Sequence, residues 1–357
     1  MIALNSPVKP DLKKLSSYLE QVNNIGWYTN FGPLHQKLTE RLEEYLGIKN
    51  LLLMSNGTLA LQVAYEVLGV KSALTTPFSF VATSSSALWQ NIPLSFSDIN
   101  PKSYNLCSTQ AQKALERNSE IDTVIATHVY GNPCDVQAFE KLSENMGVKI
   151  IYDAAHAFGV KVGSESILNF GDASILSFHA TKVYHTVEGG AVVFKQHENY
   201  ERAKELINFA IGKNGIDGIG INAKMNEYQA AVGLVLLDDI ALILEHREAL
   251  FTAYREGLKD VVGLPEWHLD SSFNGAYMPI YLDSEEKLLR VIEHLSKQGI
   301  QNRRYFYPSL DTVFPQCVNF GCDNSHQAAE GMICLPLHYN MTLNDIYSVT
   351  AAIRAVI

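Results

Sequence analysis

The chain has 357 residues, 47% hydrophobic and 18% charged, so it is long enough for a sizeable core, and we expect two domains. Its formal net charge of −10 argues against nucleic acid or an acidic membrane surface as a partner, and no basic amphipathic stretch offsets it. The longest apolar run (residues 230–237) is too short to span a bilayer, the N-terminus lacks a signal-peptide pattern, and the five cysteines show no metal-like spacing, which predicts a cytoplasmic protein without a metal site.

The first fifty residues begin with a polar lead-in and an unusual loop, GWYTNFGP, at residues 26–33. An amphipathic helix should follow, because three leucines recur at helical spacing among charged residues, namely Leu38, Leu42 and Leu46. A strand and a helix that ends near residue 68 come next, joined by the turn Ser55-Asn56-Gly57-Thr58.

Strands and helices then alternate as far as residue 153. This alternation predicts an α/β fold with a mainly parallel sheet whose two faces are covered by helices. The expected strands lie at residues 51–54, 73–77, 94–98, 121–129 and 148–153, and the expected helices of this region include 81–89 and 135–146.

A hairpin with a lysine in its loop follows, made of an apolar strand that includes Ile175 and Phe178, a polar loop, and a second strand after Gly189-Gly190. From about residue 260 strands and helices are mixed, which suggests a second, smaller domain, and we place the boundary near residue 240, giving a large domain of residues 1–240 and a smaller one of residues 241–357. The later elements are helical stretches at 197–211, 222–258, 284–298 and 343–355, and a strand at 277–282.

The lysine of this hairpin is Lys182, and a lysine between two strands is often a solvated surface residue. Here polar side chains crowd the loop, and two successive glycines indicate close backbone approach. A lysine held inside the protein loses its proton more easily than its ordinary pKa of about 10.4 implies, so it can attack a carbonyl group and form a Schiff base. The polar neighbours are Ser177, His179, Thr181 and Glu188.

Two further features point to a ligand site. Gly57 and Thr58 open a helix, where free N–H groups and the helix dipole favour a phosphate, although such a turn is usually only a cap. Asp153 ends the buried run VKIIYD, and the carboxyl ends of parallel strands are where such sheets bind ligands. The alternative for Asp153 is an N-cap for a following helix.

The sequence SFHATK followed by EGGAVV, together with the turn SNGT, resembles the DegT/StrS family of nucleotide-sugar aminotransferases, which depend on pyridoxal phosphate (PLP). The resemblance covers roughly residues 5–337, and the motifs occur in the family's order. It implies the fold-type I PLP aminotransferase architecture, with a mainly parallel sheet in the large domain and a smaller α+β C-terminal domain. It also implies a homodimer with shared active sites.

The resemblance assigns cofactor roles to individual residues. Lys182 would carry PLP and act as general acid and base, and Asp153 would keep the ring nitrogen protonated so that the ring accepts electrons. Asn222, in GINAKMN, would reach the cofactor phosphate of the neighbouring subunit. The remaining implied contacts are the phosphate with Gly57, Thr58 and Ser177, ring stacking with Phe80, and the 3-oxygen with His156.

Substrate contacts are implied for the segment NRRYFYPSL, for the loop at 26–33 and for the residue one turn beyond Lys182. Cations and tyrosines suit a nucleotide-sugar diphosphate, although adjacent arginines could also be a solvated face. Lys224 stands where the family usually has Arg, and Lys cannot replace Arg in bidentate pairing. The implied substrate-binding residues are Thr29, His185, Arg303, Tyr305 and Tyr307, with a structural role open for His185.

The function implied is transfer of an amino group from an amino acid, by family habit glutamate, to a nucleotide-linked 4-keto-6-deoxyhexose. The product would serve lipopolysaccharide O-antigen, other surface polysaccharides or natural-product glycans. The chain is most similar to the group that makes dTDP-4-amino-4,6-dideoxyglucose. A 3-keto sugar substrate and a PLP-dependent sugar dehydratase are the alternatives, but dehydratase relatives carry His in place of Lys182. A non-catalytic sensor on this fold would usually lack Lys182 or Asp153, and both are present. A Rossmann-type oxidoreductase would need a Gly-x-Gly-x-x-Gly turn after its first strand, and the sequence there, SNGTLAL, does not have that pattern.

Overall fold

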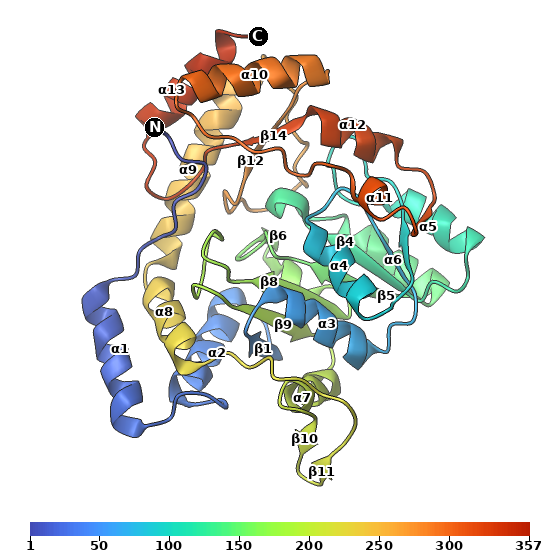
Figure 1. Cartoon of the computed structure of the whole chain (residues 1–357), viewed down its shortest axis with the longest axis vertical. Helices are drawn as coiled ribbons and strands as arrows, with labels where there is room; N and C mark the ends of the chain where they lie inside the picture. Colours follow the sequence, from blue (N-terminus) through green and yellow to red (C-terminus); the bar gives the residue numbers. More distant parts are fainter.

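The computed structural model describes residues 1–357, and its centre is an eight-stranded sheet (Figure 1). β9 alone runs antiparallel to its two neighbours, and every other neighbouring pair is parallel. The predicted mainly parallel sheet is therefore confirmed. In sheet order the strands are β1 (Leu51–Met54), β9 (Gly190–Phe194), β8 (Ala173–Ser177), β5 (Lys149–Asp153), β4 (Thr123–Thr127), β2 (Ala73–Thr75), β3 (Leu94–Phe96) and β13 (Val318–Asn319).

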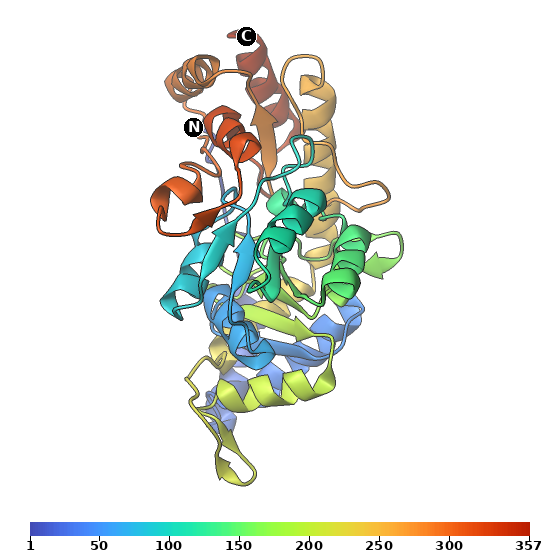
Figure 2. The same cartoon turned by 90° about the vertical axis from the view of Figure 1, so that its right-hand side faces the viewer.

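Helices cover both faces of the sheet (Figures 1 and 2). Alternate residues of β1 show this directly: Leu51 and Leu53 belong to one hydrophobic core with α2 and α8, whereas Leu52 and Met54 belong to another with α3 and α7. The helices around the sheet are α2 (Pro33–Leu46), α3 (Gly57–Leu68), α4 (Val81–Trp89), α5 (Ser108–Arg117), α6 (Val136–Met146), α7 (His197–Leu206) and α8 (Glu227–Leu237), with short 3-10 turns η1 (Val129–Gly131) and η2 (Ile167–Asn169).

Two helices were not predicted from the sequence, and a third ends earlier than predicted. The polar lead-in contains α1 (Leu12–Ile25), and α5 was not expected at all. The helix expected at 197–211 ends at Leu206, because the following glycine-rich segment forms a hairpin of β10 (Ile211–Gly212) and β11 (Gly215–Ile216). This hairpin projects from the body of the molecule (Figures 1 and 2).

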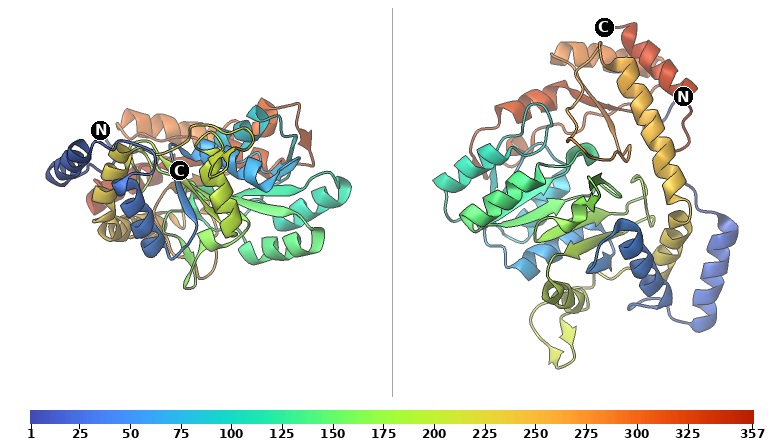
Figure 3. Two further views of the ribbon diagram at one scale, coloured as in Figure 1. Left: turned by 90° about the horizontal axis from the view of Figure 1, so that it is seen from below. Right: turned by 180° about the vertical axis from the view of Figure 1, so that it is seen from behind.

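The helical stretch expected at 222–258 is divided. Its first residues are extended, with Asn222 bridged to Asn208 and Lys224 bridged to Met54. Two helices then follow, α8 and α9 (Ile240–Leu258), with only residues 238–239 between them. α9 leads away from the sheet into the C-terminal part of the chain (Figures 1 and 3).

The C-terminal part has a hydrophobic core of its own, formed by residues between Leu250 and Ile353. An antiparallel pair, β12 (Met278–Tyr281) and β14 (Met332–Leu335), lies beside α9, α10 (Glu285–Lys297) and α13 (Leu343–Arg354). None of the helices is both long enough and apolar enough to cross a membrane. The remaining short elements are β6 (Lys161–Val162), β7 (Glu165–Ser166), α11 (Leu310–Val313) and α12 (Asp323–Gly331).

Candidate active site

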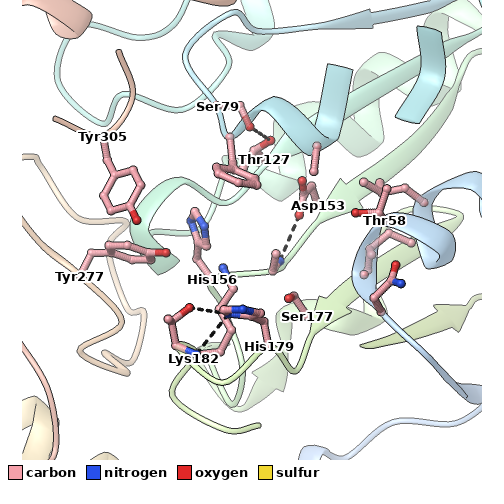
Figure 4. Close-up of a pocket in the computed structure, with 18 of the residues that line it drawn as sticks. Thr58, Ser79, Thr127, Asp153, His156, Ser177, His179, Lys182, Tyr277 and Tyr305 are labelled. Atoms are coloured by element: carbon pink, nitrogen blue, oxygen red, sulfur yellow. Dashed lines mark hydrogen bonds between the residues drawn. The ribbon is translucent and has the colours of Figure 1, made fainter. Parts of the chain in front are cut away.

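A cavity of about 360 Å³ opens at the carboxyl edge of the sheet, and Figure 4 shows the side chains that line it. Residues at or just after the ends of five strands line the cavity, because β1, β2, β4, β5 and β8 all end at this edge of the sheet. Nine of the residues predicted as site residues line the cavity, namely Gly57, Thr58, Phe80, Asp153, His156, Ser177, Lys182, Arg303 and Tyr305.

The turn after β1 forms one end of the cavity. Asn56 caps α3 by accepting a hydrogen bond from Leu59 N at 2.8 Å, so Gly57 and Thr58 occupy the first turn, where N–H groups have no intrahelical acceptor. A Cβ atom on Gly57 would lie 3.2 Å from Ser177 Cβ, so a larger residue here would be tightly packed against β8. The free N–H groups of this turn point to a position where an anion could bind at the helix N-terminus.

Gly190 explains the pair of glycines in the lysine hairpin. A Cβ atom at Gly190 would lie only 2.5 Å from the backbone of Asn56 and Gly57. The expected close approach of two backbones is thus present, and it holds the α3 turn against the hairpin that carries Lys182.

Asp153 lies at the end of β5 and is buried, with its carboxylate on the cavity wall (Figure 4). Its Oδ2 accepts a hydrogen bond from Thr83 Oγ1 at 2.6 Å, and its Oδ1 accepts one from Ala155 N at 3.1 Å. No helix begins after Asp153, so the alternative reading as a helix N-cap was wrong.

Lys182 lies in the loop between β8 and β9, and its side chain is partly buried on the cavity wall. Burial lowers the pKa of its amine to about 8, and this outweighs Asp153, whose charge acts to raise it. The neutral fraction of the amine near neutral pH is then far larger than for an ordinary lysine, as a nucleophile or general base requires. Its Nζ lies 5.9 Å from the ring centroid of Tyr277.

His156 is buried between aromatic rings beside Lys182. Its ring centroid lies 4.6 Å from that of Tyr277 and 5.9 Å from that of Phe306, the latter nearly parallel. Burial, aided by the charge of Lys182, places the pKa of His156 well below its usual range. Because Nδ1 accepts a hydrogen bond from Tyr130 N, the neutral ring carries its proton on Nε2.

The other walls are aromatic and cationic. Phe80 precedes α4, is 49% exposed, and lines the cavity with its aromatic ring. Tyr277 and Tyr305 lie on the side opposite Thr58 (Figure 4). The Arg303 guanidinium lies 4.9 Å from the centroid of the Tyr305 ring.

Four predicted site residues do not line this cavity. Thr29 and Asn222 are exposed, and Tyr307 is half-exposed with the Arg304 guanidinium 3.5 Å from its ring centroid. His185 is buried, and its Nε2 bonds to Val8 O at 2.9 Å, so the structure favours the structural alternative for this residue.

Several lining residues were given no role by the sequence. Tyr277 belongs to the strand expected at 277–282, but nothing in the sequence around it indicated a role in the site. His179 and Glu188 stood out only as polar neighbours of Lys182, yet both line the cavity, with His179 Nε2 and Glu188 Oε1 3.6 Å apart. The hydroxyl groups of Ser79 and Thr127 also lie on the wall, where they bond to each other at 3.1 Å.

These residues fit PLP. The N-terminus of α3 suits its phosphate, Phe80 offers a ring face, Asp153 offers a carboxylate held by two donors, and Lys182 offers an amine of lowered pKa. Each matches one chemical feature of the cofactor, and all lie around one cavity.

The sequence and the fold have clear relatives. Residues 11–354 match the model of the DegT/DnrJ/EryC1/StrS aminotransferase family. The chain is 39% identical to a dTDP-4-amino-4,6-dideoxy-D-glucose transaminase of Shigella dysenteriae over 99% of both chains, and 32% identical to one of Escherichia coli over 98% of this chain and 97% of that one. The structure of DesI in the presence of its TDP-sugar product superposes with a TM-score of 0.93 at 28% identity, covering 99% of this chain and 92% of that one.

A family aminotransferase from Brucella abortus superposes with a TM-score of 0.89 at 25% identity, covering 96% of this chain and 95% of that one. The match to the family model spans nearly the whole chain and includes every residue that lines the cavity. The chain therefore belongs to the DegT/DnrJ/EryC1/StrS aminotransferase family and is a PLP-dependent enzyme of that family.

Proposed function

We propose that the enzyme transfers an amino group from glutamate to dTDP-4-keto-6-deoxyglucose, giving dTDP-4-amino-4,6-dideoxy-D-glucose. The observation that carries the proposal is the 39% identity, over 99% of both chains, to a transaminase named for that product. The cavity adds support, because it combines Lys182 and Asp153 with Arg303 at its opening.

PLP, when bound, supplies an electron sink for the carbon that gains or loses the amino group. Asp153 holds the proton of the ring nitrogen, and its two hydrogen-bond donors keep the carboxylate in place. Lys182 moves the proton at the reacting carbon, for which a pKa of about 8 suits both the acid and the base role. His156, whose Nε2 carries the proton, would be the donor available to the 3-oxygen of PLP.

Arg303 and Tyr305 are proposed to bind the nucleotide diphosphate. The protein has a net charge of −10, so an anionic substrate needs local cations, and Arg303 is an exposed cation at the cavity. Tyr305 presents a ring beside it, suited to stacking on a sugar or base. For Thr29 and Tyr307, which lie away from the cavity of their own chain, the proposed substrate contact depends on the second subunit.

The enzyme is proposed to be a homodimer in which Asn222 of the partner subunit completes each site. Asn222 is exposed and lies on a segment rich in exposed apolar side chains, of which Ile219 is 90% exposed. The projecting β10–β11 hairpin belongs to the same segment (Figure 2). A second copy would cover these apolar side chains, and a two-fold interface would form two equivalent sites. The apolar side chains are Phe209, Ile211, Ile216, Ile219 and Ile221.

A division into residues 1–240 and 241–357 is proposed on two features. α8 and α9 are separated at residues 238–239, and the C-terminal core begins at Leu250. A cytoplasmic location is also proposed, because all five cysteines are free. We further propose that the product serves O-antigen or related glycans.

The alternatives are a 3-keto nucleotide sugar as acceptor and a dehydratase reaction. The test offers the purified enzyme glutamate with dTDP-4-keto-6-deoxyglucose, its 3-keto isomer and other nucleotide ketosugars, with Lys182→Ala as control. We expect an aminated product whose NMR spectrum places an equatorial nitrogen on C-4. Nitrogen on C-3, or loss of water without amination, would overturn the proposal.

A further inference from the structure

Residues 1–8, here called the N-terminal strap, run in extended form from the C-terminal part of the molecule towards α1 (Figures 1 and 3). One end of the strap pairs with the segment after α10. Ile2 forms a parallel bridge with Ile300, donates to Gly299 O at 2.8 Å and accepts from Gln301 N at 3.0 Å. Leu4 N donates to Gln301 Oε1 at 3.0 Å.

The other end of the strap bonds to the loop that carries Lys182. Asn5 Nδ2 donates to Thr181 O at 2.7 Å, and Thr181 immediately precedes Lys182. Three residues beyond the lysine, His185 bonds through Nε2 to Val8 O at 2.9 Å. The same short segment therefore holds the lysine loop on both sides of Lys182 and joins it to the C-terminal part of the chain.

The hydrogen bonds within the lysine loop do not use the carbonyl group of Thr181, which accepts its hydrogen bond from Asn5. Lys182 N donates to His179 O at 2.8 Å, and the backbone N–H of Thr181 donates to the His179 ring at 3.2 Å. Thr181 itself is exposed, so water would replace Asn5 if its amide were removed. The loop would then be freer to move away from the cavity, and a small misplacement of a reacting group is costly in rate.

We propose that Asn5 is a positioning residue for Lys182, and that the N-terminal strap fixes the lysine loop relative to the C-terminal part of the molecule. This inference rests on the proposed role of Lys182. Because the strap holds Lys182 within the cavity, it also maintains the partial exclusion of water from the amine. Asn5 does not line the cavity, so its effect is transmitted through the backbone of Thr181.

The chain offers a matched control. Asn340 Nδ2 donates to Ser6 Oγ at 2.9 Å, so Asn340→Ala removes one amide hydrogen bond to the same strap without touching the lysine loop. Asn5→Gln retains an amide donor, and Asn5→Asp retains the size of the side chain but cannot donate when ionised. Near-ultraviolet circular dichroism establishes that each variant is folded.

The first measurement is the rate at which an acylating reagent modifies Lys182 in the full-length protein without cofactor, followed by peptide mass spectrometry from pH 6 to pH 11. The wild type and Asn340→Ala should show a midpoint at about 8. Asn5→Ala should move it towards 10.5, because water reaches the amine, and Asn5→Gln should restore part of the shift. Asn5→Asp adds a carboxylate that would raise the pKa by its own charge, so its midpoint is not used in this comparison. The groups that face the amine, Asp153, His156 and Tyr277, are unchanged in every variant.

The second measurement is hydrogen exchange of the peptide covering 179–187, which should become faster in Asn5→Ala and stay unchanged in Asn340→Ala. With cofactor and substrates, kcat of Asn5→Ala should fall by about threefold or more while KM changes little. An unchanged midpoint and unchanged exchange in folded Asn5→Ala, or equal changes in Asn340→Ala, would overturn the inference. Since neither of the first two measurements uses a sugar, failure of the proposed substrate leaves them intact.

Discussion

Thr83 Oγ1 donates a 2.6 Å hydrogen bond to Asp153 Oδ2 in the buried wall of the active site. Thr83 lies in α4 and Asp153 ends β5, so this bond joins two elements seventy residues apart. The Thr83 hydroxyl also bonds to Ser79 Oγ at 3.0 Å, and Ser79 bonds to Thr127 at 3.1 Å. The Asp153 carboxylate, which we propose faces the cofactor ring, is therefore linked through Thr83 to the hydroxyl groups of Ser79 and Thr127.

Replacing Thr83 by Val should slow turnover while leaving the protein folded and able to bind cofactor. Valine keeps the shape of threonine but leaves one carboxylate oxygen without its donor, which costs about 1–3 kcal/mol, so we expect kcat to fall by roughly tenfold. Steady-state kinetics test this, with Ser86→Ala as control, because Ser86 lies on the same helix and bonds to Thr83 O rather than to Asp153. A kcat within about twofold of wild type would show that Asp153 needs no such support.

The variant Asp153→Asn should retain cofactor but transaminate at least about a hundredfold more slowly. An amide cannot favour the charged ring nitrogen, whereas the contacts of Gly57 and Phe80 remain. Asp172→Asn is the matched control, because Asp172 lies at the opposite edge of the same sheet, where it accepts from Ile150 N at 2.8 Å. Wild-type turnover in Asp153→Asn would mean that the carboxylate has only a local structural role.

The lowered pKa of Lys182 makes the stability of the cofactor-free protein depend on pH. Below about pH 8 the amine is protonated in both the folded and the unfolded chain, so the cost of burying the charge applies in full. Between about 8 and 10.5 the unfolded chain binds more protons, and the free energy of unfolding rises with pH. Lys182→Met removes this dependence.

Urea unfolding at pH 7 and pH 10 measures the effect. The stability advantage of Lys182→Met over wild type should be larger at pH 7, by up to roughly 3 kcal/mol, and should shrink at pH 10. The exposed Lys195, mutated to Met, should show no such difference between the two pH values. An advantage of the same size at both pH values would contradict the lowered pKa.

Complementation tests the shared active site. Lys182→Ala and Asn222→Ala homodimers should each be nearly inactive. In a mixed dimer one site collects both defects and the other collects neither, so activity should approach one good site per heterodimer. Mass spectrometry of differently tagged subunits confirms that mixing occurred. If heterodimers form and no activity returns, Asn222 acts within its own chain.

The sequence predicted the centre of the site because strand ends carry strong signals. Asp153 ends one apolar run, and Gly57 follows another. The pair Gly189-Gly190 predicted a close approach of two backbones, and the structure confirms it, because Gly190 packs directly against the backbone of Asn56. Parallel strands bring their carboxyl ends to one edge, so residues predicted strand by strand meet in one cavity.

Other features depend on tertiary contacts that leave no local pattern. Thr83 is one of several small polar residues in α4, and only packing shows that it meets Asp153. Tyr277 lies beside Lys182 although 95 positions separate them in the chain (277 minus 182), and Asn5 bonds to Thr181 in the lysine loop, 176 positions away. His185 lies one turn beyond Lys182 in sequence, yet it turns to Val8, which the sequence could not decide.

The central claim is that Lys182 is the residue that binds the cofactor covalently, and borohydride reduction of the holoenzyme tests it most directly. The purified protein should be yellow, and reduction followed by peptide mapping should leave the cofactor on the peptide that contains Lys182. Lys182→Ala, treated in the same way, should carry no label. A label on any other lysine of the wild-type protein would contradict the assignment of this site.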